Sequence, residues 1–245
     1  MLKSNFVREI LKNHEDFCLS LLQKRNLISS VLFESEAEAL RRKMKNNSIT
    51  IKQQEAHDLP AICRLIEEAF ASVQESNHRE QFLVTRLLSS PGFIPELSLT
   101  AWIQNELVGY ILLTEIEILS DSTSKPSLSL APLAVRPKFQ KQGIGAALIK
   151  EAHKRACQLN YETILVLGHK DYYPRFGYKK AENFGITFPF EVQPEFCMVK
   201  ELTPGAASRA AGQVKYPKAF FEYYNFRHSV VFSSLIFSKI LTCLD

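Results

Sequence analysis

The stretch LSLAPLAVRPKFQKQGIGAAL, residues 128–148, decides how the rest of the chain is read. Its apolar first part, Leu128 to Val135, has the length and composition of a strand. A basic loop follows, and a helical pattern begins at about Gly143 and runs to Cys157. The first turn of a helix carries unpaired N–H groups and the positive end of the helix dipole, which together bind phosphate oxygens. We therefore expect a diphosphate-binding cradle here.

Glycine and basic residues suit this loop to an anionic ligand. Gly143 and Gly145 would let the ligand approach the main chain with no side chain in the way. Arg136, Lys138 and Lys141 are expected to add positive charge at the same mouth.

Two other phosphate-binding motifs fit the loop less well. A dinucleotide-binding turn reads G-x-G-x-x-G directly after its strand, but Leu148 replaces the third glycine here and seven residues separate Val135 from Gly143. A nucleotide P-loop needs Gly-Lys-Ser/Thr, which does not follow. A dinucleotide-dependent oxidoreductase therefore stays only as a weaker alternative.

The motif Q-x-x-G-x-G at Gln140–Gly145, with its L-A-V-x-P lead-in at Leu133–Pro137, resembles the GNAT superfamily of acetyl-CoA-dependent N-acetyltransferases. The later run YPRFGY at 173–178 resembles the family's Tyr-x-x-x-Gly-Phe element. The resemblance covers about residues 49–203 and extends to a bacterial subgroup with a Tyr-Pro-x-Ala-Phe-Phe tail, here Tyr216–Phe221.

This resemblance implies an α/β (α+β) fold with a central mixed, mostly antiparallel twisted sheet flanked by helices. The domains expected are a helical N-terminal extension (1–48), a GNAT-like acetyltransferase domain (49–203) and a C-terminal extension (204–245) that packs on the domain or on a partner. Final strands are expected at 184–190 and 196–201.

The resemblance also implies the site. Neighbouring strands are expected to part after Val135, so that the pantetheine arm pairs with the freed main chain. The cofactor-binding residues predicted are Leu133, Ala134, Val135, Gln140, Lys141, Gln142, Gly143, Ile144, Gly145 and Ala146.

Two catalytic residues are predicted. Tyr173, four residues before Gly177, is nominated by the family motif to protonate the departing thiolate, although its position also suits aromatic packing. Glu115 ends an alternating series on the strand at 108–118 and is the candidate general base, with a solvated strand end as the alternative. No cysteine lies in a motif that favours a nucleophile, so we expect direct transfer from acetyl-CoA to a primary amine in a ternary complex. A catalytically inactive acyl-CoA sensor or partner-docking module is the alternative.

Composition is typical of an ordinary globular protein. Of 245 residues, 46% are apolar and 23% charged, and the net charge of +4 does not indicate nucleic-acid binding. The five cysteines are widely spaced and lack a C-x-x-C, which argues against a disulfide framework or a metal site and favours a reducing compartment. The cytoplasm is therefore the expected location. The apolar run at 230–244 is too short for a transmembrane helix and suggests a docking helix or a homodimer contact, with a membrane-surface helix as the alternative.

Overall fold

A computed structural model describes residues 48–72, 79–121 and 123–221 of the chain. The chain divides into two compact units, residues 1–48 and 49–245. The expected N-terminal helices and the apolar run at 230–244 lie outside the described residues.

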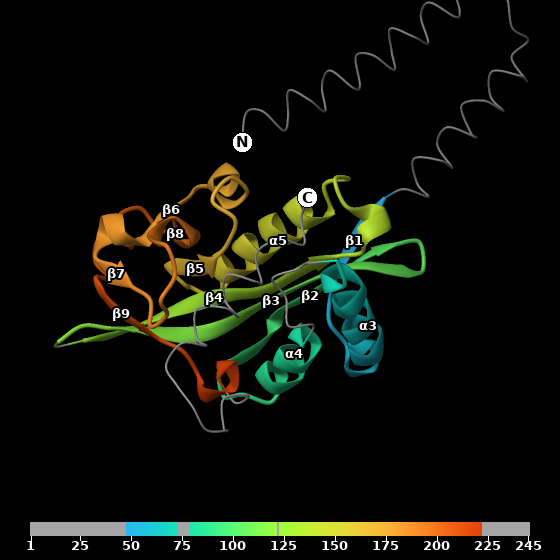
Figure 1. Ribbon diagram of the computed structural model, residues 1–245, viewed down its shortest axis with the longest axis horizontal. Helices are drawn as coiled ribbons and strands as arrows, with labels where there is room; N and C mark the ends of the chain where they lie inside the picture. The colour runs from blue at the N-terminus through green and yellow to red at the C-terminus, as the bar shows by residue number, and fades with distance from the viewer. Residues whose placement is uncertain (1–47, 73–78, 122, 222–245) are drawn as a thin grey trace, which may run out of the picture. The chain divides into compact units, whose positions relative to one another are not determined.

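The described part of the second unit is built on one twisted sheet (Figure 1). Its strands follow the order β1-β2-β3-β4-β5-β8-β6, with β9 paired to both β3 and β7. The pairs are antiparallel except for β4 with β5 and β7 with β9. The strands are β1 (Ile49–Gln53), β2 (Phe93–Ile103), β3 (Glu106–Leu119), β4 (Ser124–Val135), β5 (Thr163–Leu167), β6 (Tyr178–Lys180), β7 (Ile186–Thr187), β8 (Cys197–Glu201) and β9 (Gly212–Lys215). This confirms the mixed, mostly antiparallel fold class.

Helices cover both faces of the sheet. In Figure 1, α5 (Ile144–Gln158) lies on one side, whereas α3 (Leu59–Phe70) and α4 (Glu80–Leu88) lie on the other. Because side chains alternate between faces along a strand, the side chains of β3 belong to two separate cores. Ile111 and Leu113 pack on the α5 side, and Tyr110 and Leu112 pack on the side of α3 and α4.

α5 sits close to the sheet because its buried residues recur at helical spacing. Ile144, Leu148 and Ala152 form one stripe, and all three are buried. Burying a leucine or isoleucine side chain contributes about 1.5–3 kcal/mol. Gly109 of β3 allows the close approach, since a β-carbon there would stand 2.8 Å from Cγ2 of Ile144. The start of α5 is thereby fixed against the sheet.

The late part of the chain differs in detail from the expectation. Of the strand expected at 184–190, only the two residues of β7 are strand, Phe184 ends a 3₁₀ turn, and residues 188–190 are irregular. Beyond residue 204, β9 joins the sheet by pairing with Leu119, Ile118 and Glu117 of β3. Its four residues are too few to show an alternating pattern in the sequence.

Candidate active site

The loop between β4 and α5 forms an open cradle around Gly143. This glycine caps the N-terminus of α5 with φ of +83°, in the left-handed region that favours glycine. A β-carbon built on it would meet nothing within 4 Å, so the space above the helix start is empty of protein. The N–H groups of the first turn of α5 are therefore accessible to a ligand of negative charge.

A cavity of about 500 Å³ opens over this helix start. Seven of the ten predicted cofactor-binding residues line it, and its remaining walls come from the loop before Gln140, from α5 and from the turn after β5. The lining residues are Val135, Phe139, Gln140, Lys141, Gly143, Ile144, Gly145, Ala146, Lys150, Tyr172, Arg175 and Phe176. Leu133, Ala134 and Gln142 do not line it. Ile144 lines it although only 1% of its surface is exposed.

Gln140 ties the loop to the end of β4. Its Nε2 donates to the carbonyl oxygen of Val135 at 3.3 Å. The loop before it is tightened by a 3₁₀ turn in which the Gln140 N–H bonds to the oxygen of Pro137 at 3.2 Å. Gln140 therefore stabilises the loop through hydrogen bonds to other parts of the protein.

The edge of β4 next to the cradle is not paired with β5. β5 pairs only with Leu128 and Ser129 of β4. The strands therefore part after Ser129, six residues before Val135, which corrects the expectation that they part after Val135. On the opposite edge, Pro132 lacks an N–H to donate to β3, and the pairing of β4 with β3 shifts register at the same place, between Ile111 and Leu113.

The freed edge presents main-chain groups at Leu133 and Val135. The Arg136 N–H donates to the oxygen of Val108 on β3 at 2.9 Å. Hydrogen-bonding direction alternates along an antiparallel strand, so the N–H groups of Val135 and Leu133 face away from β3. They point to the side that β5 has left, where an extended ligand could pair with them.

Arg136 and Lys138, which were expected to add positive charge at the mouth of the cradle, form ion pairs with acidic residues and do not line the cavity. Arg136 pairs with Glu68 at 3.1 Å and with Glu106 at 2.7 Å, and Lys138 pairs with the same Glu106 at 2.7 Å. The hydrogen bond from Lys138 lowers the pKa of Glu106 below its ordinary value, and the bond from Arg136 adds to the effect. These ion pairs fasten the loop to α3 and to the β2–β3 turn.

Two cations that the sequence analysis missed line the cavity instead. Lys150 lies on α5 two turns after Gly143, and Arg175 comes from the 3₁₀ turn Tyr173–Phe176. The Arg175 guanidinium carbon lies 4.3 Å from the centre of the Tyr172 ring. Spacing could have identified Lys150, since residues i and i+7 share a helix face.

Tyr173 is buried beside the cavity, and its neighbour Tyr172 lines it. The Tyr173 ring meets the rings of Tyr172 and Tyr178 edge-on, at centroid distances of 5.3 and 5.5 Å. It belongs to the same buried cluster as Leu133 and Val135. With 3% of its surface exposed, Tyr173 is part of the core on the α5 side of the sheet.

Glu115 lies apart from the cradle. It stands opposite Leu128 of β4, seven residues from Val135, which corresponds to about 23 Å along a strand. Its carboxylate accepts a hydrogen bond from the Tyr161 hydroxyl. Burial, together with this bond, raises the pKa of Tyr161. The structure thus does not bring the two predicted catalytic residues together.

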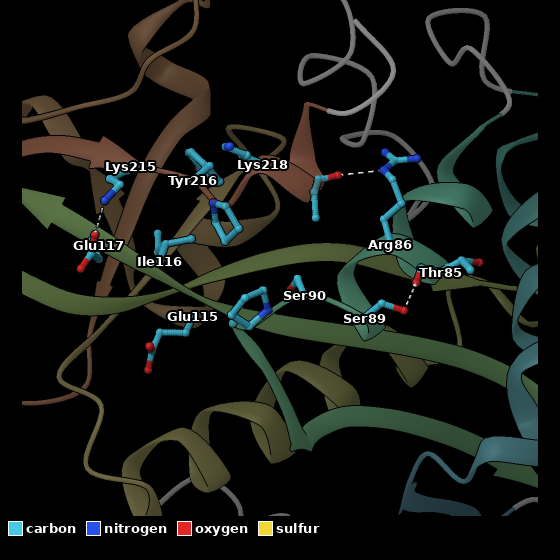
Figure 2. A pocket seen from close by; sticks show the side chains of 14 residues that line it. Thr85, Arg86, Ser89, Ser90, Glu115, Ile116, Glu117, Lys215, Tyr216 and Lys218 are labelled. Atoms are coloured by element: carbon cyan, nitrogen blue, oxygen red, sulfur yellow. Dashed lines mark hydrogen bonds and ion pairs between the residues drawn. The ribbon is translucent and has the colours of Figure 1, made fainter. Parts of the chain in front are cut away.

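A second cavity, of about 690 Å³, opens at the point along β3 where its pairing partner changes from β2 to β9 (Figure 2). Glu115 and Ile116 extend to opposite sides of β3 in this view. Glu117 pairs with Lys215 at 2.9 Å, and Nε of Arg86 donates to the oxygen of Ala219 at 2.8 Å. Glu115 is among the residues that line this cavity, but its carboxylate, bonded to Tyr161, extends to the side of β3 opposite Ile116.

In the parts of the chain that the structure describes, no group of three or more His, Cys, Asp and Glu could hold a metal ion. Over the same residues, no helix is long and apolar enough to span a bilayer.

The fold and the cradle agree with what comparison with known proteins finds. Residues 96–180 match the family model described as an acetyltransferase (GNAT) domain. This stretch is thus similar to a GNAT acetyltransferase domain, and the resemblance read from the motifs is confirmed.

Two relatives from Escherichia coli are similar in sequence. The uncharacterized N-acetyltransferase YjhQ of strain K12 is 36% identical over 118 residues, which is 48% of this chain and 65% of YjhQ. The chain thus spans just under two thirds of that relative. The uncharacterized N-acetyltransferase YhbS is 23% identical over 163 residues, covering 66% of this chain and 93% of YhbS.

Two solved structures share the fold. The crystal structure of Escherichia coli YhbS in complex with CoA superposes with a TM-score of 0.63 at 25% identity, covering 70% of this chain and 91% of that one. A GNAT family acetyltransferase from Brucella melitensis in complex with acetyl-CoA gives a TM-score of 0.58 at 26% identity, covering 71% and 99%.

Proposed function

We propose that this protein is an N-acetyltransferase that moves the acetyl group of acetyl-CoA directly to a primary amine in a ternary complex. The observation that carries the proposal is the open helix start at Gly143 beside the unpaired edge of β4. The helix start can bind a diphosphate, and the unpaired strand edge can pair with an extended pantetheine amide chain. The two relatives solved with CoA and with acetyl-CoA support the same assignment.

The cradle's residues fit the diphosphate of CoA. The N–H groups at the start of α5 and the Lys141 side chain would hold its oxygens, and the absent side chain at Gly143 leaves room for them. Gln142, Ile144, Gly145 and Ala146 belong to the same loop and first helical turn. The pantetheine arm would then run back along β4 from Val135 toward Leu133.

The main chain of β4 would activate the thioester. An N–H at Leu133 or Val135 that bonds the thioester oxygen would stabilise the negative charge that develops there, an effect worth about 3 kcal/mol in a dry site. The amine nitrogen attacks the carbonyl carbon, and the C=O electron pair moves to oxygen. Return of that pair breaks the C–S bond and expels the thiolate of CoA.

Tyr173 would supply the proton that the departing thiolate takes up. Its ring lies in the buried cluster that includes Leu133 and Val135, next to the proposed path of the pantetheine arm. We leave Glu115 out of the proposal, because its register position is about 23 Å from Val135. The proton released by the amine is then taken up by water.

A second function, an acyl-CoA sensor without turnover, is favoured by one observation. Tyr173 is only 3% exposed and is packed between two other tyrosines, as expected of a residue that serves the core. Such a protein would bind acetyl-CoA through the same cradle and transfer nothing.

Release of free thiol from acetyl-CoA tests the enzyme assignment. The panel should include a polyamine, an aminoglycoside, an amino acid, a lysine peptide and a peptide with a free N-terminus, with tertiary amines as matched controls. Thiol release that depends on one class of primary amine, with an acetylated product by mass spectrometry, is the expected result. Binding of acetyl-CoA without transfer to any amine would favour the sensor.

A further inference from the structure

The charge on the walls of the cradle exceeds what a diphosphate requires. Lys141, Lys150 and Arg175 line the cavity, and no aspartate or glutamate does. The helix N-terminus adds about half a positive charge. A diphosphate diester carries about two negative charges, so a ligand that balances these walls brings a further anionic group.

The cations are arranged in two places. Lys141 precedes Gly143 in the loop at the start of α5, whereas Lys150 follows Gly143 by seven residues on the helix. Seven residues are two turns, about 10 Å along the axis, and they return to the same face. Lys150 therefore provides positive charge at a second point of the cavity, away from the amides that would hold a diphosphate.

Arg175 faces the same cavity from a different element and is held in place. Its guanidinium stacks on the Tyr172 ring at 4.3 Å, and its Nε donates to the Tyr172 carbonyl oxygen at 3.2 Å. Only one of its donor groups is used in that bond, so the terminal amino groups can serve a ligand. A guanidinium ordered in this way is well suited to bidentate recognition of a phosphate.

Neither cation is neutralised by a neighbouring acid. Among the described residues, the structure shows no carboxylate paired with Lys150 or Arg175. Arg136 and Lys138, by contrast, share Glu106 within the same loop. The basic residues of this region therefore divide into two that fasten the loop and others whose charge is directed to the cavity.

We propose that Lys150 and Arg175 form a subsite for a phosphomonoester dianion, the 3′-phosphate on the ribose of CoA, separate from the diphosphate site at the start of α5. This inference rests on the proposed function. A phosphomonoester carries about −1.5 to −2 charges at neutral pH, which is the excess that these walls balance. The subsite makes the protein selective for free acyl-CoA over thioesters that share the pantetheine arm but lack this phosphate.

Calorimetric titration with CoA and with 3′-dephospho-CoA tests the subsite. The wild-type protein is expected to bind CoA at least about tenfold more tightly than dephospho-CoA, because only CoA can form the charge-assisted hydrogen bonds to Lys150 and Arg175. Arg175→Gln and Lys150→Gln should each weaken CoA binding by about tenfold and leave dephospho-CoA binding nearly unchanged. Arg175→Lys should recover part of the preference.

Lys154→Gln is the matched control. Lys154 lies one turn further along α5, pairs with Glu151 at 3.8 Å and does not line the cavity, so its loss should change neither affinity. Equal affinity of the wild type for the two ligands would overturn the subsite and leave the proposed function standing. An equal loss for both ligands in Arg175→Gln would also overturn it. Failure of the wild type to bind either ligand would instead overturn the proposed function.

Discussion

The ring of Tyr173 lies against the α-carbon of Gly168: a β-carbon added at residue 168 would stand 2.2 Å from two carbons of that ring. Gly168 directly follows β5, and its N–H donates to the oxygen of Phe196 at 2.9 Å. The glycine is therefore held in place, and its missing side chain determines where the tyrosine ring can lie.

Gly168→Ala should displace the Tyr173 ring, because the fixed backbone of residue 168 cannot yield. Overpacking of this kind costs about 1–3 kcal/mol of unfolding free energy, which urea denaturation measures. In a Tyr173→Ala background the same substitution should cost much less, since the ring is gone. An equal cost in both backgrounds would contradict the contact.

Tyr173→Phe separates the enzyme from the sensor. Removal of the hydroxyl alone should lower kcat by at least about 100-fold if Tyr173 donates the proton to the thiolate. The affinity for acetyl-CoA should not change, because the ring still fills its place. Tyr172→Phe, which keeps the surface on which Arg175 stacks, is the control and should retain activity. Full turnover in Tyr173→Phe would assign Tyr173 to packing.

Gly109→Ala should disturb the start of α5 from the opposite side of the interface. Its β-carbon would lie 2.8 Å from Cγ2 of Ile144 and 3.0 Å from Cδ1 of Leu148. We expect a loss of about 1–3 kcal/mol in stability, together with weaker CoA binding, because Ile144 follows Gly143 directly. Adding Ile144→Ala, which removes the contacting methyl group, should restore part of the stability. Unchanged stability of Gly109→Ala would show that α5 is not held closely.

His153 should make stability depend on pH. It lies on α5, and its Nε2 is 3.0 Å from the Tyr178 hydroxyl. Burial, with a smaller contribution from Lys200, lowers the pKa of His153 to about 4. The unfolded chain gains a proton below about pH 6.5, but the folded chain does not until about pH 4. Stability should therefore be complete above pH 6.5 and fall by up to about 3 kcal/mol as the pH approaches 4.

Urea denaturation at pH 7.5 and pH 4.5 measures this loss. His153→Gln can still bond to the Tyr178 hydroxyl but does not titrate, so its stability should fall less between the two pH values. Other groups contribute equally to both proteins and cancel in the comparison. An identical loss in the variant would show that His153 is not the cause.

The sequence predicted those features that depend on residues near one another in the chain. β4 ends at Val135, as predicted, and α5 begins one residue after the glycine expected to open it. Gln140, Lys141 and Gly143 were nominated for the cavity because the whole loop is a single local motif. Their part in binding CoA stays a prediction.

Features set by distant residues were not predictable in this way. Arg136 pairs with Glu68, which is 68 residues away in the chain, so the local pattern of the loop does not show the ion pair. Arg175 lies within a tyrosine motif in the sequence, and only the packing of the turn after β5 brings it to the cavity. The strands part six residues earlier than expected. The position depends on how β5 pairs with β4, which the sequence of β4 alone does not show.

Titration calorimetry with acetyl-CoA tests the central claim most directly, for the wild type and for Gly143→Glu. The added side chain would occupy the space above the helix start, in a backbone conformation that costs about 1–2 kcal/mol for a residue with a β-carbon, and would set a carboxylate against the diphosphate. We predict saturable heat with the wild type and none with Gly143→Glu, while thermal melting shows that the variant is folded. Absence of heat with the wild type, or unchanged affinity in the variant, would contradict the assignment of this helix start as the acetyl-CoA site.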